Sequence, residues 1–171
     1  MIVYQIILDT PPEICLPCIK SVQDYAVRSG AEYVCHTDCP DMYAHYKHRE
    51  AIANAMRVDF ARQHDDVVYA DWDVQIGDTF EWPAGDKLYC DKWNPEAFFR
   101  TNGYTDFLNH VWEDYIEYCL DVKTHAKEWC RINKIWRRLM PNYDCVQTVN
   151  EEKYIHYFGK RKWPSQSASQ L

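Results

Sequence analysis

The chain has 171 residues, which suits one domain, and a formal net charge of −7, which disfavours nucleic acid and anionic membranes as partners. Hydrophobic residues make up 47% of the chain and aromatic residues 15%, enough to bury one core. The apolar residues 1–8 lack the basic region and cleavage site of a secretory signal and are too short to span a bilayer, so we expect a cytoplasmic protein.

The first elements form a repeated strand–helix–strand pattern. Residues 1–8 predict a strand, 13–29 an amphipathic helix that ends at Gly30, and 31–36 a second strand. Residues 48–64 are alanine-rich with helical periodicity, and 67–74 form an apolar strand. The pattern predicts the α/β class: a single, minimal Rossmann-like domain with a mostly parallel central sheet flanked by helices. Since no glycine-rich phosphate loop is present, a metal and basic groups would have to hold phosphates.

The second half of the chain predicts shorter elements. We expect a strand at 87–90, an irregular segment at 94–103, helices at 106–120 and 123–139, and strands at 145–149 and 154–155. Residues 165–171 read as a flexible tail, so the domain is expected to cover 1–164.

Two acidic residues end the apolar run at 67–74. Asp71 and Asp73 are two positions apart, so on a strand they would point to the same side and one divalent cation could contact both. Open α/β sheets bind ligands at the carboxyl ends of their strands. Two solvated aspartates at a strand end are the alternative interpretation.

Four of the eight cysteines have spacings similar to a zinc site, Cys15 with Cys18 and Cys35 with Cys39. Ordinary packing explains them equally well, and without an export signal we expect reduced thiols.

A second group of chemically useful residues lies near the end of the chain. His156 follows a strand-like segment, with Gly159 three residues later and Lys162 six residues later. A neutral imidazole can complete a carboxylate site for Mn²⁺, and a lysine can neutralise phosphate. A solvated basic tail is the alternative.

These two groups together resemble a known family. The segment 69–74, Tyr-Ala-Asp-Trp-Asp-Val, looks like the Asp-x-Asp motif of metal-dependent glycosyltransferases of the GT-A fold. The segment 155–163 is similar to the closing His-x-x-Gly-x-x-Lys motif of the retaining, glycogenin-like and lipopolysaccharide galactosyltransferase-like families. The resemblance implies that Asp71, Asp73 and His156 bind Mn²⁺ or Mg²⁺. It also implies that Gly159 and Lys162 contact the diphosphate of a nucleoside diphosphate sugar and that transfer retains configuration.

The same resemblance suggests further site residues. Asn102, followed by Gly103, is similar to a donor-sugar motif with one intervening residue missing, and the resemblance implies that Asn102 belongs to the catalytic site. Arg57, Asp59 and Arg62 resemble the Asp and Arg that precede the acidic motif in capsular-sugar and mannosyltransferase-like relatives, with the matching arginine left open. A surface ion pair between an arginine and Asp59 explains the helix residues equally well. Asp91 and Asn94 are further polar candidates near the sugar.

We therefore expect a glycosyltransferase that uses a nucleotide sugar and an unknown glycan, protein or small-molecule acceptor. Two other classes stay open. A metal-dependent nucleotidyltransferase or phosphohydrolase could use the same aspartates, and a noncatalytic nucleotide-sugar-binding module would suit so short a chain.

Overall fold

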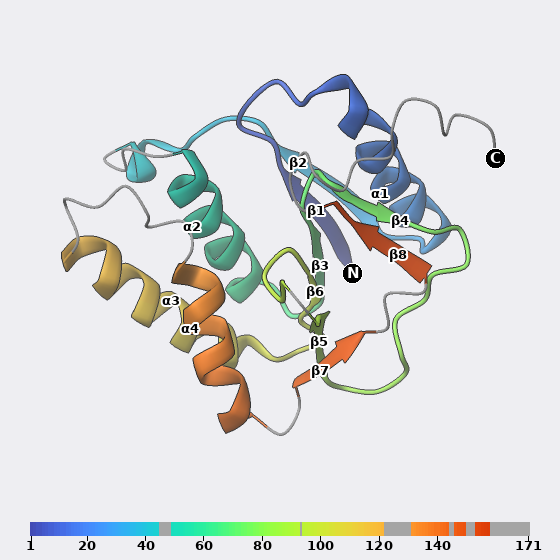
Figure 1. The fold of residues 1–171 in the computed structure, drawn as a ribbon. Helices are drawn as coiled ribbons and strands as arrows, with labels where there is room; N and C mark the ends of the chain where they lie inside the picture. The colour runs from blue at the N-terminus through green and yellow to red at the C-terminus, as the bar shows by residue number, and fades with distance from the viewer. Residues whose placement is uncertain (45–48, 93, 122–130, 144–145, 150–152, 158–171) are drawn as a thin grey trace.

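The structure is a computed structural model that describes residues 1–44, 49–92, 94–121, 131–143, 146–149 and 153–157. A central sheet lies between a layer of three helices and a second layer made of one helix and a two-stranded ribbon (Figure 1). The sheet has six strands in the order β2-β1-β3-β6-β5-β7. Their bounds are β1 Ile2–Ile6, β2 Glu32–His36, β3 Val67–Ala70, β5 Leu88–Asp91, β6 Phe98–Arg100 and β7 Val146–Val149.

The sheet is mostly parallel, as the sequence predicts. β1 pairs in parallel with both β2 and β3, and β5 pairs in parallel with β7. β6 runs antiparallel to both β3 and β5, so β3 and β5 point the same way. The carboxyl ends of the first three strands therefore lie at one edge, where an open α/β sheet presents its ligand site.

Four α-helices are described: α1 Leu16–Arg28, α2 Arg49–Arg62, α3 Thr105–Asp121 and α4 Arg131–Leu139. Short 3-10 helices cover Glu13–Cys15, Asp41–Tyr43 and Met140–Asn142. Pro17 occupies the first turn of α1, where its missing N–H costs nothing, and Gly30 follows the helix with φ of 62°, the left-handed conformation that ends helices. Helices α2, α3 and α4 cover one face of the sheet, and α1 covers the other (Figure 1).

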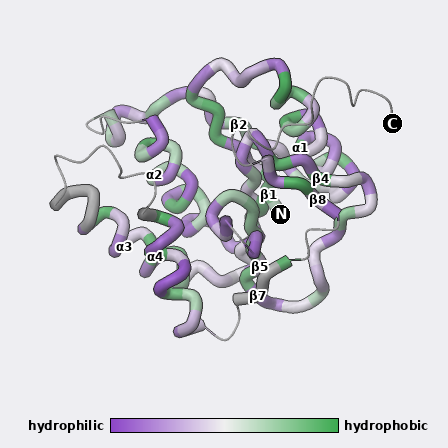
Figure 2. The backbone as a smooth tube through the Cα atoms, viewed as in Figure 1, coloured by the Kyte–Doolittle hydropathy of each residue, from purple (hydrophilic) through white to green (hydrophobic). Residues whose placement is uncertain are grey.

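Successive side chains along a strand point to opposite faces of the sheet, so the structure has one hydrophobic core on each face. Tyr69 belongs to the core beneath α2, α3 and α4, whereas its neighbours Val68 and Ala70 belong to the core beneath α1. Figure 2 shows hydrophobic and hydrophilic residues alternating along the helices, consistent with one buried face on each. The centre of the sheet is thus covered on both sides, and β3 and β5 are buried along their whole length.

A small second sheet distinguishes the structure from the sequence-based expectation. Strand β4, Val74–Ile76, pairs antiparallel with β8, Tyr154–His156, and packs over α1. The strand expected at 67–74 is therefore two strands in different sheets, separated by a turn at 71–73. Strand β6 was also missed, because three residues are too few to display a period of two.

The helix expected at 123–139 and the tail expected at 165–171 lie partly or wholly outside the described residues. The helix expected at 123–139 is described only from Arg131 to Leu139. The tail at 165–171 and the domain boundary at 164 fall in a segment that is not described, so they stay predictions.

Candidate metal centre

The segment Asp71-Trp72-Asp73 forms a turn at the carboxyl end of β3. The Val74 N–H donates to the Asp71 carbonyl at 3.0 Å, which closes the turn, and the Asp71 N–H donates to the Ala97 carbonyl at 2.8 Å. The expectation that the two aspartates share one side of a strand was wrong, because the chain leaves the central sheet here to enter β4. The turn, rather than strand alternation, brings the two carboxylates together.

His156 reaches these carboxylates through the small second sheet. In the β4–β8 ladder Val74 is directly opposite His156, and the Tyr157 N–H donates to the Asp73 carbonyl at 3.0 Å. His156 Nε2 consequently lies 3.3 Å from Asp73 Oδ1. Two segments more than eighty residues apart in sequence thus meet at one point.

The three side chains form a cluster that could hold a metal ion. One potential ligand atom from each of Asp71, Asp73 and His156 lies within 4.8 Å of the others. Within the described ranges this is the only cluster of three or more histidine, cysteine or acidic residues with such spacing. Oxygen ligands suit hard divalent cations, and one imidazole in addition suits Mn²⁺.

Arg57 supports the cluster from the middle of α2. Its Nη2 donates to Asp71 Oδ1 at 2.8 Å, and its Nη1 donates to the Glu96 carbonyl at 2.9 Å. The guanidinium also lies over the Tyr69 ring, 4.5 Å from its centroid, and the Tyr69 hydroxyl donates to Asp71 Oδ1. Of the two candidate arginines of α2, Arg57 and Arg62, Arg57 is the one that contacts the acidic turn.

The electrostatics of the cluster favour a cation. Burial raises the pKa of Asp71; the Arg57 guanidinium opposes this shift, and the Asp73 charge adds to it. Burial lowers the pKa of His156, but its hydrogen bond to Asp73 and the negative charges around it outweigh burial, so the net shift is upward. The raised pKa of His156 reflects the negative charges of Asp73, Asp71 and Asp91, and a bound divalent cation would neutralise part of that charge.

Asp59 and Arg62 lie outside the cluster. Arg62 donates to Asp59 Oδ1 through Nε at 2.9 Å and Nη2 at 2.6 Å, and the Tyr43 hydroxyl donates to Asp59 Oδ2 at 2.5 Å. The Arg62 guanidinium lies over the Trp112 ring of α3, 4.8 Å from its centroid. These contacts are those of an ion pair that joins α2 to its neighbours, so the structure does not bring the two residues to the acidic turn.

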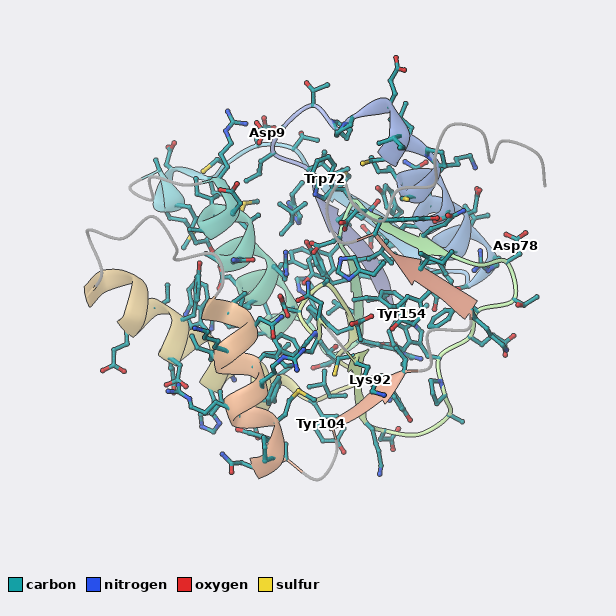
Figure 3. All side chains as sticks on the ribbon, viewed as in Figure 1. Asp9, Trp72, Asp78, Lys92, Tyr104 and Tyr154 are labelled. Atoms are coloured by element: carbon teal, nitrogen blue, oxygen red, sulfur yellow. The ribbon has the colours of Figure 1, made fainter. Side chains whose placement is uncertain are left out.

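Asn102 lies at the opposite end of β3. It belongs to the turn after β6, where the Thr101 N–H donates to the Val67 carbonyl and the Gly103 N–H to the Asp65 carbonyl. Figure 3 accordingly shows Tyr104 at the edge of the molecule opposite Trp72. The structure does not bring Asn102 to the acidic turn, because β6 runs antiparallel to β3 and carries its following turn away from Asp71.

Of the remaining candidate residues, the structure describes Asp91 and Asn94 but not Gly159 and Lys162. Asp91 is buried and accepts hydrogen bonds from the Tyr154 hydroxyl at 2.6 Å and from the Asn94 N–H at 2.5 Å. Its charge contributes to the raised pKa of His156, so it lies close enough to act on the cluster electrostatically. Gly159 and Lys162 lie outside the described residues.

The sequence reasoning missed Glu96. Its side chain is 6% exposed, and burial raises its pKa to about 7 despite the opposing charge of Arg57. The charges of Asp71 and His156 also act on it. A single glutamate in a segment expected to be irregular carries no pattern, and only the pairing of β6 with β3 brings it to the cluster.

Among the described residues, Cys15, Cys18, Cys35 and Cys39 do not form a cluster with the spacing of metal ligands. Cys15 and Cys18 are buried at the start of α1, whereas Cys35 and Cys39 are exposed. Burial and nearby negative charge that includes Asp73 raise the pKa of Cys15 to about 11 and that of Cys18 to about 12, so both remain thiols at neutral pH.

A cavity of about 140 Å³ opens beside the acidic turn. It lies at the carboxyl end of β1 and the start of α2, and Figure 3 shows two of its lining residues, Asp9 and Trp72, near each other at this edge. The lining residues are Ile6, Ile7, Leu8, Asp9, Arg49, Glu50, Ala53 and Trp72. Arg49 donates to the Leu8 carbonyl and to Asp9 Oδ1, which ties α2 to the end of β1.

Solved structures resemble this fold, although no protein-family model and no curated protein sequence matches the chain. A glycosyltransferase involved in the glycosylation of the major capsid of PBCV-1 has a TM-score of 0.58 and 11% identity, over 88% of this chain and 81% of that one. A protein from STIV has a TM-score of 0.47 and 12% identity, over 92% and 85%. A mutant Drosophila beta-1,4-galactosyltransferase 7, in complex with manganese, UDP-Gal and xylobiose, has a TM-score of 0.44 and 10% identity, over 99% and 77%.

The fold is therefore a small GT-A-like α/β domain of the kind found in glycosyltransferases. At these identities the similarity concerns the fold alone. Among the helices in the described part of the chain, none is both long enough and apolar enough to cross a membrane.

Proposed function

We propose that this protein is a metal-dependent glycosyltransferase that takes a sugar from a nucleoside diphosphate sugar. The observation that carries the proposal is the convergence of Asp71, Asp73 and His156 at the carboxyl edge of a GT-A-like sheet. A divalent ion such as Mn²⁺ held there would supply electrostatic stabilisation of the departing diphosphate.

The protein's own groups would then hold and orient the donor. Arg57 keeps the Asp71 carboxylate ionised and fixes its direction, since it is buried and bonded to that carboxylate. Lys162 and Gly159 of the closing motif are proposed to contact the diphosphate, and Lys162 would neutralise part of its charge.

The cavity beside the turn suits the nucleoside. Trp72 offers an aromatic surface on which a base could stack, and the Asp9 carboxylate could accept hydrogen bonds from ribose hydroxyls. Because Trp72 stands between Asp71 and Asp73 in the chain, a ligand in the cavity would have its phosphates close to the metal cluster.

A thermal-shift screen tests the proposal. Nucleoside diphosphate sugars are added with and without Mn²⁺ to the wild type, to Asp73→Asn and to Asp78→Asn, a matched control at an exposed position. A donor at 100 times its Kd stabilises the folded state by about 2.7 kcal/mol, so the true donor should raise the melting temperature of the wild type and the control. Asp73→Asn should show no such increase. Failure of every nucleotide sugar to stabilise the wild type would reject the proposal.

A second measurement separates transfer from the other classes. Steady hydrolysis of a nucleotide sugar, with Mn²⁺ and without acceptor, should release free sugar and nucleoside diphosphate. Release of phosphate or pyrophosphate would indicate a phosphohydrolase or nucleotidyltransferase, and donor binding without turnover would indicate a binding module. The anomeric configuration of the freshly released sugar, followed by NMR, tests the retention that we propose from the closing motif.

A further inference from the structure

Glu96 is held beside the metal cluster by its own backbone. Its carbonyl accepts from Arg57 Nη1 at 2.9 Å, and the next residue, Ala97, accepts from the Asp71 N–H at 2.8 Å. The segment between β5 and β6 is therefore bonded both to Asp71 and to the arginine that supports it. The backbone at Glu96 is thus fixed next to Asp71 and Arg57.

The Glu96 carboxyl has an unused hydrogen-bonding atom. Its Oε2 is buried and has no hydrogen-bond partner among the residues that the structure describes. The side chain as a whole is more than nine-tenths buried, so bulk water does not replace the missing partner. Buried polar atoms in folded proteins are nearly always paired, and one left open beside a ligand site calls for a hydrogen-bond donor from the ligand.

The backbone contacts of residues 96 and 97 with Arg57 and Asp71 place Glu96 next to the acidic turn, within electrostatic range of the cluster. Its pKa responds to Arg57, to Asp71 and to His156, and burial raises that pKa to about 7. Asp71 follows β3 of the central sheet and His156 belongs to β8 of the second sheet, and the charges of both act on Glu96.

We propose that Glu96 accepts a hydrogen bond from a hydroxyl of the donor's sugar and selects donors that present a hydroxyl at that position. The inference rests on the proposed function. In a nucleoside diphosphate sugar the sugar is bonded directly to the diphosphate. A diphosphate bound at Asp71, Asp73 and His156 therefore places the sugar ring next to the cluster. A hydroxyl is the donor group that such a ring offers, and a carboxyl oxygen accepts a hydrogen bond from it.

The test compares binding of sugars that have or lack single hydroxyls. Isothermal titration calorimetry with Mn²⁺ measures UDP, GDP, their hexose derivatives and the monodeoxy forms of those hexoses. The proteins are the wild type, Glu96→Met, which keeps the length of the side chain without its acceptor, and the matched control Glu32→Met on exposed β2. Glu96→Gln is the second variant, since it preserves side-chain volume and one acceptor oxygen should Glu96→Met fail to fold.

The wild type and the control should bind one monodeoxy sugar at least about tenfold more weakly than its parent, because that analogue leaves Glu96 without a partner. In Glu96→Met the ratio of the two dissociation constants, monodeoxy sugar to parent sugar, should fall below about threefold. Glu96→Gln should give a ratio between those of the wild type and Glu96→Met. All folded variants should bind the free nucleoside diphosphate with affinities within about twofold of the wild type.

The outcomes separate this inference from the proposed function. If no nucleoside diphosphate or nucleotide sugar binds the wild type with Mn²⁺, the donor site itself is rejected, and the inference with it. If donors bind but discrimination is the same in wild type and Glu96→Met, only the role of Glu96 is overturned. If Glu96→Met binds every donor like the wild type yet loses hydrolysis, Glu96 acts on the attacking water and the assignment to the donor sugar is wrong.

Discussion

Arg57 Nη2 lies 2.8 Å from Asp71 Oδ1, and this ion pair joins the middle of α2 to the turn that carries the acidic motif. Only 7% of the Arg57 side chain and 18% of the Asp71 side chain are exposed. Little water screens the pair, so each charge depends on the other. The negative charges around Arg57, Asp71 foremost, raise its pKa although burial alone would lower it.

Replacing Arg57 should damage both stability and metal binding. Arg57→Ala leaves the buried Asp71 carboxylate without its counter-charge, so we expect the free energy of unfolding to fall by about 3–5 kcal/mol in urea denaturation. Arg62→Ala is the matched control on the same helix, since its more exposed pair with Asp59 predicts a loss of about 1 kcal/mol. Equal losses in the two variants would contradict the special position of Arg57.

Mn²⁺ affinity should fall as pH decreases through the pKa of His156. Metal binding requires the neutral imidazole, and the charge of Asp73 raises the pKa at which that form is lost. Below this pKa the affinity should drop by about tenfold per pH unit for each proton that the metal displaces. In His156→Asn, calorimetric titrations should show weaker binding and a slope of log affinity against pH that is smaller by about one. An unchanged slope would mean that His156 is not a ligand.

Glu96 should make the wild type less stable as pH rises. Burial raises its pKa in the folded protein from 4.5 to about 7, so its contribution is complete below about pH 4.5 and is lost as pH increases through about 7. A shift of this size corresponds to about 3 kcal/mol as an upper bound. Glu96→Gln stays neutral, so in urea denaturation it should be more stable than the wild type at pH 8 and equal to it near pH 4.5. Glu32→Gln, at an exposed position, should show no such difference, and a similar pH effect there would contradict the explanation.

Replacing Asn102 should destabilise the turn after β6 without changing the affinity for Mn²⁺. Its φ is 48°, a left-handed conformation that asparagine and glycine tolerate, and its side-chain amide donates to the Gly85 carbonyl. Asn102→Ala should therefore cost about 1–2 kcal/mol in thermal or urea unfolding, while Asn102→Gly should cost less. Mn²⁺ affinity should stay at the wild-type value in both. A loss of metal affinity in Asn102→Gly would restore Asn102 to the site.

Local sequence patterns predicted much of the first half of the chain. Apolar runs, turn residues and helical periodicity predicted β1, α1, β2 and α2 close to their observed bounds, because these elements follow one another and pair with neighbours in sequence. The α/β class with a mostly parallel sheet follows from the same alternation, and the structure confirms it. The acidic pair at the end of β3 was visible as well, since two carboxylates after an apolar run form a local pattern.

What the sequence alone determined, then, was the class of fold and the residues able to bind a metal. Tertiary structure decided which of them meet. Asp71 and Asp73 lie in a turn that only the β4–β8 pairing brings to His156, and antiparallel β6 carries Glu96 to that cluster and Asn102 away from it. The physical reason is that a strand's direction and partner depend on burial and hydrogen bonding over the whole sheet, which a short stretch of residues does not encode.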